Sequence, residues 1–336
     1  MNIAIVGATG NVGRKIIEIL EKKQINIENL FLLASKNSEG KKINYNGKEH
    51  TVTNLEKFDF SSVKIAFFAA GSGVAEKWAH VAAEKTIVID NSKYFRKDPD
   101  IPLIVPEVNS KKLSDVKNKN IIANANCSVI PVVVALKPLH DLYNINRIVA
   151  STYQSVSGAG KSAMDELLSQ TEDYFQNKEI DSKNFTKQIA FNAIPHIDSF
   201  LENGYTKEEQ KTTDEIKKIL DKKIKVTSTC VRIPVLVSHC ISANVEFNKK
   251  CDLDEIRKVL STSPGCKVID EHQDGGYITP VEAEDKFETF ISRIRLDESR
   301  ENTINLWIVS DNLVKGAALN AVQIAESLIT NDFYGR

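Results

Sequence analysis

The feature that most constrains the fold is a glycine-rich turn directly after a short apolar run. Residues Asn2–Val6 read as a buried strand, the turn Gly7–Gly13 (GATGNVG) follows at once, and Lys15–Lys22 has helical character. Glycines between a strand and a helix let the backbone approach a pyrophosphate group at the helix N-terminus. A tight turn without a ligand would have the same local sequence. The residues expected to hold a dinucleotide here are Gly7, Thr9, Gly10, Asn11, Val12 and Gly13.

Alternating apolar runs and helical stretches continue through the first third of the chain. Segments of helical character such as Val74–Ala83 separate the apolar runs. This alternation predicts parallel βαβ units in a doubly wound sheet of the Rossmann type, and such a sheet favours the nucleotide-binding interpretation of the glycine turn. The expected strands are Ile3–Val6, Leu30–Ala34, Ile65–Ala69 and Thr86–Ile89.

A second domain is expected beyond the strand Ile121–Ala123. This strand runs into Asn124–Ser128, and Val129–Leu139 then reads as an apolar helix with Pro131 in its first turn. Longer and more alternating runs follow and predict an α+β domain with a larger mixed sheet. They are Arg147–Val156, Lys225–Val231, His239–Phe247, Phe287–Leu296 and Thr303–Ser310. Helices are expected at Lys207–Leu220, capped by Thr206, and at Val314–Ile329, with a polar surface excursion at Asp173–Lys187.

The composition fits a globular chain of two domains with well-filled cores. Of 336 residues, 42% are hydrophobic, and 44 lysines and arginines nearly balance 45 aspartates and glutamates. This balance gives no field that would favour nucleic acid or an anionic membrane. No apolar run reaches the ~20 residues that span a bilayer, and the chain opens with a strand-like run instead of a signal peptide. We therefore expect a soluble, cytoplasmic protein.

The end of the second expected strand bears on the choice of cofactor. An NAD enzyme normally ends this strand with an acid that binds a ribose hydroxyl. Here Ala34–Ser38 reads ASKNS, with Lys41 and Lys42 close behind. No carboxylate would repel a 2′-phosphate there, although the lysines of an ordinary solvated loop would look the same. The residues expected at this phosphate are Ser35, Asn37 and Ser38.

Cys127 stands where an expected strand ends and an expected helix begins. Free backbone N–H groups and the helix dipole favour a thiolate at such a position. A small buried apolar cysteine is an equally good interpretation of the local sequence. The other four cysteines lack this setting, and five cysteines without a Cys-x-x-Cys pair argue against a disulfide framework or a metal cluster.

Two further polar side chains depend on the fold for any catalytic role. His239 lies in an apolar run, where a packed core histidine is common. Arg232 is seven residues earlier, so a continuous strand would place the two on opposite faces. They can share a pocket only if Pro234 breaks the strand between them. For Glu208 and Lys211, three residues apart on one helix face, a solvated ion pair is the plain interpretation.

The chain resembles the aspartate-semialdehyde dehydrogenase family almost end to end. The matching segments include the glycine turn, the segment around Cys127 and the segment that ends at His239. They are Gly7–Gly13, Asp90–Ser92, Phe95–Arg96, Asp98–Asp100, Val105–Asn109, Asn124–Ser128, Tyr153–Gly160, Arg232–His239 and Ser310–Glu326. The resemblance implies a fold like that of glyceraldehyde-3-phosphate dehydrogenase. It also implies NADPH-dependent reductive dephosphorylation of L-4-phosphoaspartate to L-aspartate 4-semialdehyde.

The resemblance further implies the function of each domain. Residues 1–127 would form an NADP-binding Rossmann domain completed by a C-terminal helix at 313–336, and residues 128–312 would form the catalytic and dimerisation domain. A cytoplasmic homodimer is expected. It would act on small-molecule substrates in lysine, threonine and methionine biosynthesis, without a metal.

Roles for single residues also come from the resemblance. Cys127 would carry the acyl group as a thioester, Gln154 would orient the substrate, and His239 would act as acid and base. Arg232 would bind the substrate α-carboxylate, and Glu208 the ammonium group. Arg96, Asn126 and Lys211 would hold the phosphate, while Ser157, Gly158 and Asn312 would contact the nicotinamide half of the cofactor.

One position departs from the family pattern. The family commonly has an arginine two residues after the strand-end serine, where it grips the 2′-phosphate. Here that position is Asn37, with Lys36 beside it. A preference for NADP is still expected, but a weaker one than an arginine would give.

Two other functions stay open at this point. N-acetyl-gamma-glutamyl-phosphate reductase shares the cysteine, the histidine and the phosphate-leaving chemistry. Its substrate amine is acylated, so a carboxylate placed for a free ammonium, Glu208, favours the aspartyl substrate. A non-catalytic NADP-binding sensor would share the glycine turn but would not need Cys127 at a helix start.

Overall fold

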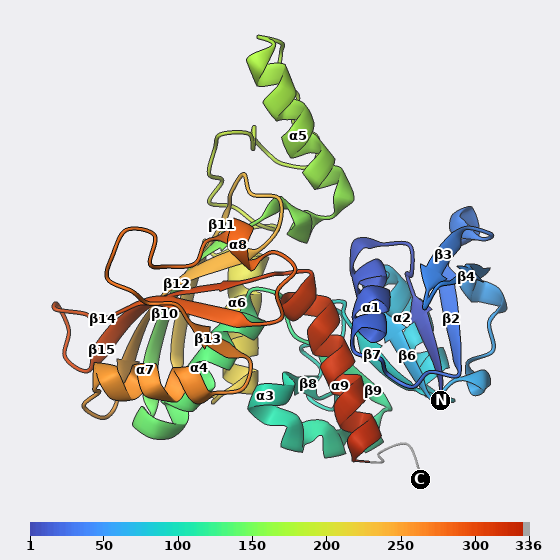
Figure 1. Ribbon diagram of the computed structural model, residues 1–336, viewed down its shortest axis with the longest axis horizontal. Helices are drawn as coiled ribbons and strands as arrows, with labels where there is room; N and C mark the ends of the chain where they lie inside the picture. The colour runs from blue at the N-terminus through green and yellow to red at the C-terminus, as the bar shows by residue number, and fades with distance from the viewer. Residues whose placement is uncertain (332–336) are drawn as a thin grey trace. The chain divides into compact units, whose positions relative to one another are not determined.

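The computed structural model describes residues 1–331, which divide into two units (Figure 1). The first unit contains Met1–Ala125 together with the chain from Ala317 onward, and the second is Asn126–Gly316. Each unit is built on its own sheet. Of the C-terminal helix expected at 313–336, residues 332–336 lie outside the described part of the chain.

The first unit is built on a seven-stranded parallel sheet with the order β5-β2-β1-β6-β7-β9-β8. Its strands are β1 (Asn2–Val6), β2 (Asn29–Ala34), β5 (Thr53–Asn54), β6 (Ile65–Phe68), β7 (Ile87–Asp90), β8 (Leu103–Ile104) and β9 (Ile121–Asn124). The chain order reverses between β1 and β6, and open α/β sheets bind ligands beyond the carboxyl ends of such strands. The doubly wound parallel sheet is therefore confirmed. A separate hairpin pairs β3 (Lys42–Tyr45) with β4 (Lys48–Thr51).

The C-terminal helix α9 (Leu319–Thr330) is part of the first unit, although the whole second unit lies between it and the rest of the first unit in sequence. Asn320 Nδ2 donates to Asn124 Oδ1 at 2.6 Å, and Lys23 Nζ lies 2.8 Å from Glu326. The expected helix is confirmed from Leu319 onward, whereas its first turn, Val314–Ala318, is π-helical. The other α-helices of this unit are α1 (Asn11–Lys22), α2 (Ser72–Ala83) and α3 (Pro106–Asn109).

The second unit contains a mixed six-stranded sheet with the order β11-β10-β12-β15-β14-β13. Its strands are β10 (Ile145–Gln154), β11 (Lys225–Arg232), β12 (His239–Phe247), β13 (Cys266–Val268), β14 (Thr289–Leu296) and β15 (Thr303–Ser310). The mixed sheet is confirmed, and it has one strand fewer than the sheet of the first unit but longer strands. All but one of its strands have eight to ten residues. The long apolar runs in the sequence therefore indicated long strands and not a large number of strands.

Three helices lie along one face of this sheet in Figure 1: α4 (Val129–Tyr143), α6 (Lys207–Ile219) and α7 (Leu253–Thr262). On β12 the buried residues Ile241, Ala243 and Val245 alternate with half-buried Ser242 and Asn244. Because side chains alternate between the two faces of a strand, the buried residues point to the face covered by the helices and the half-buried residues point to the opposite face. The short helix α8 (Pro280–Ala283) contacts β15 on that opposite face.

Helix α5 (Lys161–Phe175) extends away from the sheet of the second unit in Figure 1. Its buried positions include Ala163 and Leu167, which pack against Val156 and Ile189. A stripe this short gives little periodic signal, which is why the sequence did not predict the helix. The polar excursion expected at 173–187 is confirmed, because most of its residues are exposed.

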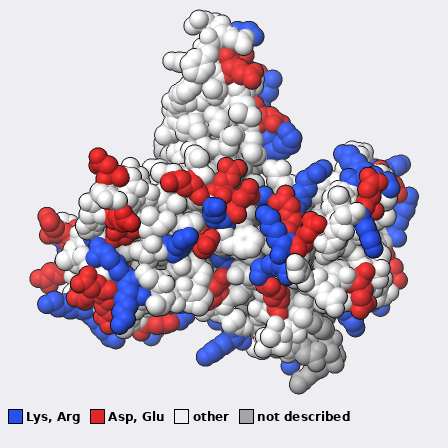
Figure 2. Space-filling model, in the orientation of Figure 1, with Lys and Arg blue, Asp and Glu red and all other residues white. Residues whose placement is uncertain are grey.

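Charged side chains of both signs are spread over the surface. On the face shown in Figure 2, acidic and basic residues are interspersed without a large patch of one sign. This distribution matches the formal net charge of −1. Among the described residues, no helix is both long and apolar enough to cross a membrane.

The glycine turn leads to a prediction about stability. A Cβ atom at Gly13 would lie 2.2 Å from the Gly7 carbonyl oxygen and 2.9 Å from Ala8 Cα. Because these are backbone atoms, Gly13→Ala should destabilise the protein by roughly 1–3 kcal/mol, measured as a lower melting temperature in scanning fluorimetry. The matched control is Gly73→Ala, since a Cβ there meets nothing within 4 Å. Equal melting temperatures for the two variants would contradict the close packing of the turn.

Candidate active site

The segment that carries Cys127 is held by its neighbours on both sides. Asn126 Oδ1 accepts hydrogen bonds from the Ser128 N–H at 2.8 Å and from Ser128 Oγ at 2.9 Å, just before α4 begins. The Asn126 N–H donates to Glu215 at 2.7 Å. A Cβ atom at Gly316 would lie 3.0 Å from Cys127 Cβ, so another part of the main chain approaches the cysteine closely. Cys127 itself is partly exposed and therefore accessible to a substrate.

His239 lies beside this cysteine, with Nε2 3.3 Å from Cys127 Sγ. Its other ring nitrogen, Nδ1, is 3.1 Å from both the backbone nitrogen and the hydroxyl oxygen of Ser155. A backbone N–H can only donate, so Nδ1 is the acceptor of that bond and the proton of a neutral ring sits on Nε2, facing the sulfur.

The electrostatic surroundings keep this imidazole neutral. Burial is the largest cause and lowers the pKa of His239 to about 3, and the charge of Arg232 lowers it as well. The Glu208 carboxylate and the Ser238 backbone act in the opposite direction. Burial also lowers the pKa of Arg232, whereas the charges of Cys127 and Glu208 raise it.

A break in the chain brings Arg232 and His239 to the same place. β11 ends at Arg232 and β12 begins at His239, and Pro234 lies in the intervening loop. The strand break that the sequence required is confirmed. Arg232 Nη1 donates to the Ser155 carbonyl at 2.6 Å, and a Cβ atom at Gly158 would lie 3.2 Å from this Nη1 and 3.3 Å from His239 Nε2. Position 158 therefore favours glycine while both side chains are in place.

Helix α6 supplies a cluster of charges next to the cysteine segment. Glu208 Oε1 accepts hydrogen bonds from Asn126 Nδ2 at 2.9 Å and from Gln154 Nε2 at 3.4 Å. Lys211 Nζ lies 2.5 Å from Glu208 Oε2 and 3.1 Å from Asp198. The ion pair that the spacing allowed is present, but it is not solvated, because the Glu208 and Lys211 side chains are only 9% and 14% exposed. Asp198, which reaches Lys211 from a separate loop, is not marked by any sequence pattern.

A buried polar network lies behind His239. Asn312 Oδ1 accepts hydrogen bonds from the Ser238 N–H at 2.8 Å and from Ser155 Oγ at 3.0 Å, while Asn312 Nδ2 donates to Ser157 Oγ at 2.9 Å. Ten residues singled out from the sequence thus belong to this one unit, and contacts link them around Cys127. They are Asn126, Cys127, Gln154, Ser157, Gly158, Glu208, Lys211, Arg232, His239 and Asn312.

The first unit contains a cavity of about 670 Å³ at the glycine turn. Gly7 has a positive φ of 86°, and a Cβ there would lie 2.7 Å from the Ala69 backbone. This position in the cavity wall therefore has no room for a side chain. A cavity of this size beside such a turn fits a dinucleotide. Of the expected cofactor residues, Gly7, Thr9, Gly10, Ser35 and Asn37 line it, whereas Asn11, Val12, Gly13 and Ser38 are not among its lining residues.

Other residues that line this cavity were not predicted from the sequence. Asn54, Glu56, Lys77 and Trp78 reach the cavity from β5, the turn after it and α2, and no local motif marks them. Arg96, expected at the phosphate, belongs to the first unit, where its Nη2 donates to the Asn91 carbonyl at 3.0 Å.

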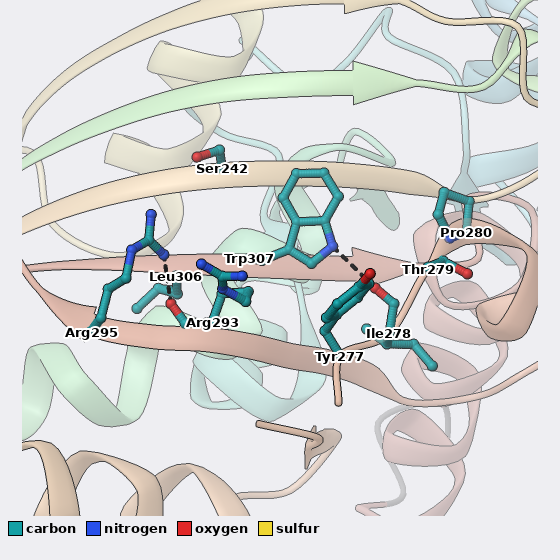
Figure 3. Close-up of a pocket in the computed structure, with 9 residues that line it drawn as sticks. All are labelled: Ser242, Tyr277, Ile278, Thr279, Pro280, Arg293, Arg295, Leu306 and Trp307. Carbon is teal, nitrogen blue, oxygen red and sulfur yellow. Dashed lines mark hydrogen bonds between the residues drawn. The ribbon is translucent and has the colours of Figure 1, made fainter. Parts of the chain in front are cut away.

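A second cavity, of about 280 Å³, lies on the sheet of the second unit (Figure 3). Trp307 forms part of its wall and donates from Nε1 to the Ile278 carbonyl at 3.1 Å. Neither cysteine nor histidine lines it, so it is separate from the site around Cys127. Its lining residues are Ser242, Tyr277, Ile278, Thr279, Pro280, Arg293, Arg295, Leu306 and Trp307.

A thiol in contact with an imidazole, with a buried arginine beside them, suits thioester chemistry, and the family models that match the chain assign it to the semialdehyde dehydrogenase class. Residues 2–116 match the family model described as the NAD binding domain of semialdehyde dehydrogenase, and residues 136–315 match that of its dimerisation domain.

Known proteins narrow this class to one family. An aspartate-semialdehyde dehydrogenase from Aquifex aeolicus is 49% identical over 331 residues, which cover 97% of both chains. Another, from Rickettsia bellii, is 49% identical over 329 residues. Aspartate semialdehyde dehydrogenase II from Vibrio cholerae, solved also in complex with ASA, matches with a TM-score of 0.96 at 47% identity over 98% of each chain. The chain belongs to the aspartate-semialdehyde dehydrogenase family.

The buried histidine predicts a pH dependence of stability. Because its pKa is about 3 in the folded chain and about 6.5 in an unfolded one, the unfolded state binds more protons between these values. This contribution to the free energy of unfolding is fully present above about pH 6.5 and is lost as the pH falls towards 3. His239→Gln should therefore reduce the slope of stability against pH by up to roughly one proton, measured by urea unfolding.

A control for this measurement is His272→Gln, which removes an exposed histidine and should keep the original slope. Identical slopes for the unmodified protein and His239→Gln would show that His239 is not held neutral by the fold.

Proposed function

We propose that this chain catalyses the NADPH-dependent reductive dephosphorylation of L-4-phosphoaspartate to L-aspartate 4-semialdehyde. The observation that carries the proposal is the 3.3 Å contact between Cys127 Sγ and His239 Nε2. Relatives named aspartate-semialdehyde dehydrogenase that match 97% of the chain support the substrate, as does a solved relative whose title includes ASA. The product feeds lysine, threonine and methionine biosynthesis.

Cys127 is the nucleophile and His239 its acid–base partner. The Cys127 thiolate attacks the acyl carbon of the acyl phosphate, the carbon–sulfur bond forms, the bond to the phosphate oxygen breaks, and inorganic phosphate leaves a thioester. NADPH, when bound, supplies the hydride that reduces this acyl group to the aldehyde level. His239 Nε2, the ring nitrogen that faces the sulfur, carries the proton of the neutral ring and donates it in a hydrogen bond to the oxygen of the tetrahedral thiohemiacetal. The carbon–sulfur bond then breaks, which releases the aldehyde and restores the thiolate.

Charged side chains around the pair would orient the substrate. The planar guanidinium of Arg232 suits the α-carboxylate, and the Glu208 carboxylate suits the ammonium group. A carboxylate at the amine favours an aspartyl substrate over an N-acetylated glutamyl substrate. Gln154 would help to orient the substrate, and the phosphate would contact Arg96, Asn126 and Lys211.

NADP would bind at the glycine turn of the first unit. The cavity there offers the backbone of Gly7 and Gly10 to the pyrophosphate and the Ser35–Asn37 segment to the 2′-phosphate. Ser157, Gly158 and Asn312 would contact the nicotinamide half. Residues 1–127, with the C-terminal segment that begins at 313, would act as the cofactor domain, and residues 128–312 as the catalytic and dimerisation domain.

The functional form would be a cytoplasmic homodimer. Residues 136–315 match a dimerisation domain, and one face of the sheet in this unit keeps side chains such as Tyr153, Ser242 and Trp307 only half-buried. The cavity of Figure 3 opens on this face. A second copy would cover it. All five cysteines are free thiols, and a catalytic thiolate works best in the reducing cytoplasm.

The test of the function is phosphate-dependent oxidation of L-aspartate semialdehyde, with N-acetyl-L-glutamate semialdehyde as competitor. Cys127→Ala should lower turnover by on the order of a thousandfold or more, because no thioester forms, while NADP binding stays nearly intact. Cys251→Ala removes a different, partly exposed thiol and should keep full activity. Turnover by Cys127→Ala would refute the mechanism. Preference for the acetylated substrate would favour the reductase alternative, and an unmodified protein that binds NADP but turns over neither substrate would favour the sensor.

A further prediction concerns cofactor choice. Asn37 lines the cofactor cavity but cannot provide the charged, bidentate contact of an arginine. Asn37→Arg should lower the Michaelis constant for NADP several-fold with little change for NAD. The gain should stay below the roughly 1.5–3 kcal/mol of a buried charged hydrogen bond, because position 37 is exposed.

The matched control is Asn118→Arg, which adds the same charge to the first unit at an exposed position outside the cavity. Steady-state kinetics with both cofactors decide the outcome. An unmodified enzyme that favours NAD, or an Asn37→Arg variant that gains nothing with NADP, would mean that this loop does not hold the 2′-phosphate.

A further inference from the structure

Thr152 is a buried residue of β10 that contacts Gln154, the residue expected to orient the substrate. The Thr152 hydroxyl donates to Gln154 Oε1 at 3.0 Å, and the two residues are 0% and 2% exposed. They are two positions apart on the strand, so both side chains point to the same face of the sheet. Thr152 has no role in the function proposed above.

Glu208 determines which end of the Gln154 amide faces it. Both of its oxygens face donors, Asn126 Nδ2 at 2.9 Å and Lys211 Nζ at 2.5 Å, so this group is an ionised carboxylate that only accepts hydrogen bonds. The amide atom 3.4 Å from Glu208 Oε1 is therefore the donor Nε2. The amide oxygen is then the atom that faces Thr152, and the hydroxyl must donate to it.

The neighbour of Thr152 on the adjacent strand leaves the hydroxyl proton available to Gln154. Thr152 is paired with Cys230 on β11. Burial raises the pKa of the Cys230 thiol to about 12, whereas a hydrogen bond with the Thr152 hydroxyl lowers it. Cys230 is therefore a neutral thiol, whose sulfur is a weak acceptor. The amide oxygen of Gln154 is the stronger acceptor and takes the hydroxyl proton.

This orientation presents a hydrogen-bond donor beside the nucleophile. Gln154 Nε2 carries two hydrogens, of which one is directed to Glu208, and no second acceptor for Nε2 is found among the described residues. Glu208 Oε1 also accepts from Asn126, which immediately precedes Cys127. The second hydrogen of Nε2 can therefore be donated to an oxygen of a substrate bound at Cys127.

We propose that Thr152 is a positioning residue, which holds the Gln154 amide so that Nε2 faces Glu208 and donates to an acceptor oxygen of the substrate. Without the hydroxyl, no described residue would donate to Gln154 Oε1, and a buried amide with an unsatisfied oxygen would turn or shift. The proposal rests on the function proposed above, in which Gln154 orients the substrate.

The hydroxyl can be removed with little change of shape. Thr152→Val replaces it by a methyl group and keeps a β-branched side chain in the strand, and Thr152→Ser keeps the hydroxyl. The matched control is Thr289→Val on β14. Thr289 is also 0% exposed, but its hydroxyl has no hydrogen-bond partner among the described residues.

The experiment is steady-state oxidation of L-aspartate semialdehyde by the full-length enzyme with NADP and inorganic phosphate. Thr152→Val should lower kcat/KM for the semialdehyde roughly fivefold to tenfold, the range that one neutral hydrogen bond supports, without a change in the Michaelis constant for NADP. Thr152→Ser and Thr289→Val should stay within about twofold of the unmodified enzyme. Thr152→Ala repeats the test if Thr152→Val does not fold.

A double-mutant cycle separates positioning from simple support of the structure. In a Gln154→Ala background no amide is left to be held, so adding Thr152→Val should change kcat/KM by less than about twofold. An equal loss in both backgrounds would mean that Thr152 acts through something other than Gln154. Unchanged kcat/KM in Thr152→Val, or no rescue by Thr152→Ser, would also overturn the inference alone. An unmodified enzyme without phosphate-dependent turnover refutes the proposed function, and the inference with it.

Discussion

The main chain of Ser155 is the part of the structure on which the arrangement around Cys127 depends most. Its N–H donates to His239 Nδ1 and its carbonyl accepts from Arg232 Nη1 at 2.6 Å. One residue at the end of β10 therefore orients both the imidazole and the guanidinium. Because these are backbone contacts, they depend on the path of the chain after β10 more than on the side chain at this position. The result is a site whose donors are in place before a substrate binds.

Burial makes each of these contacts important for stability. His239, Arg232 and Glu215 are almost fully removed from water, where an unpaired polar or charged group would be strongly destabilising. His239 avoids a buried charge because its ring stays neutral. Glu215 accepts a hydrogen bond from the backbone N–H of Asn126, and Arg232 donates one to the Ser155 carbonyl, so neither charged group is unpaired. The charges that remain available to a substrate are thus few, and they lie close to the nucleophile.

The parts of this structure that the sequence predicted are those encoded by neighbouring residues. The glycine turn, the strands β12 and β15, and the N-cap at Thr206 all follow from local patterns, and the structure has them where they were expected. Asp198 and Glu215 could not be found in this way: Glu215 acts on a residue 89 positions away, and Asp198 reaches Lys211 from a loop outside the helix of that lysine. Spacing could not assign a role to Glu208 and Lys211, because a helix pattern shows which residues share a face and not what covers that face. Helix α5 was missed because it buries too few apolar side chains to show a period.

The cofactor cavity also shows the difference between a local pattern and its surroundings. Position 37 lacks an arginine, but other charged residues also line the cavity. Lys36 and Lys77 both line the cavity, together with the carboxylate of Glu56. Glu56 lies 3.4 Å from Lys77, so these two charges largely offset each other and the charge of Lys36 remains. Lys77 and Glu56 are both more than 60% exposed, which means that water and salt screen them strongly. The lining therefore offers a local positive charge to an anionic group, but without the directional contact that a guanidinium would add. Under the proposed function, the choice between NADP and NAD would therefore depend on this whole set of charges, and not on the identity of residue 37 alone.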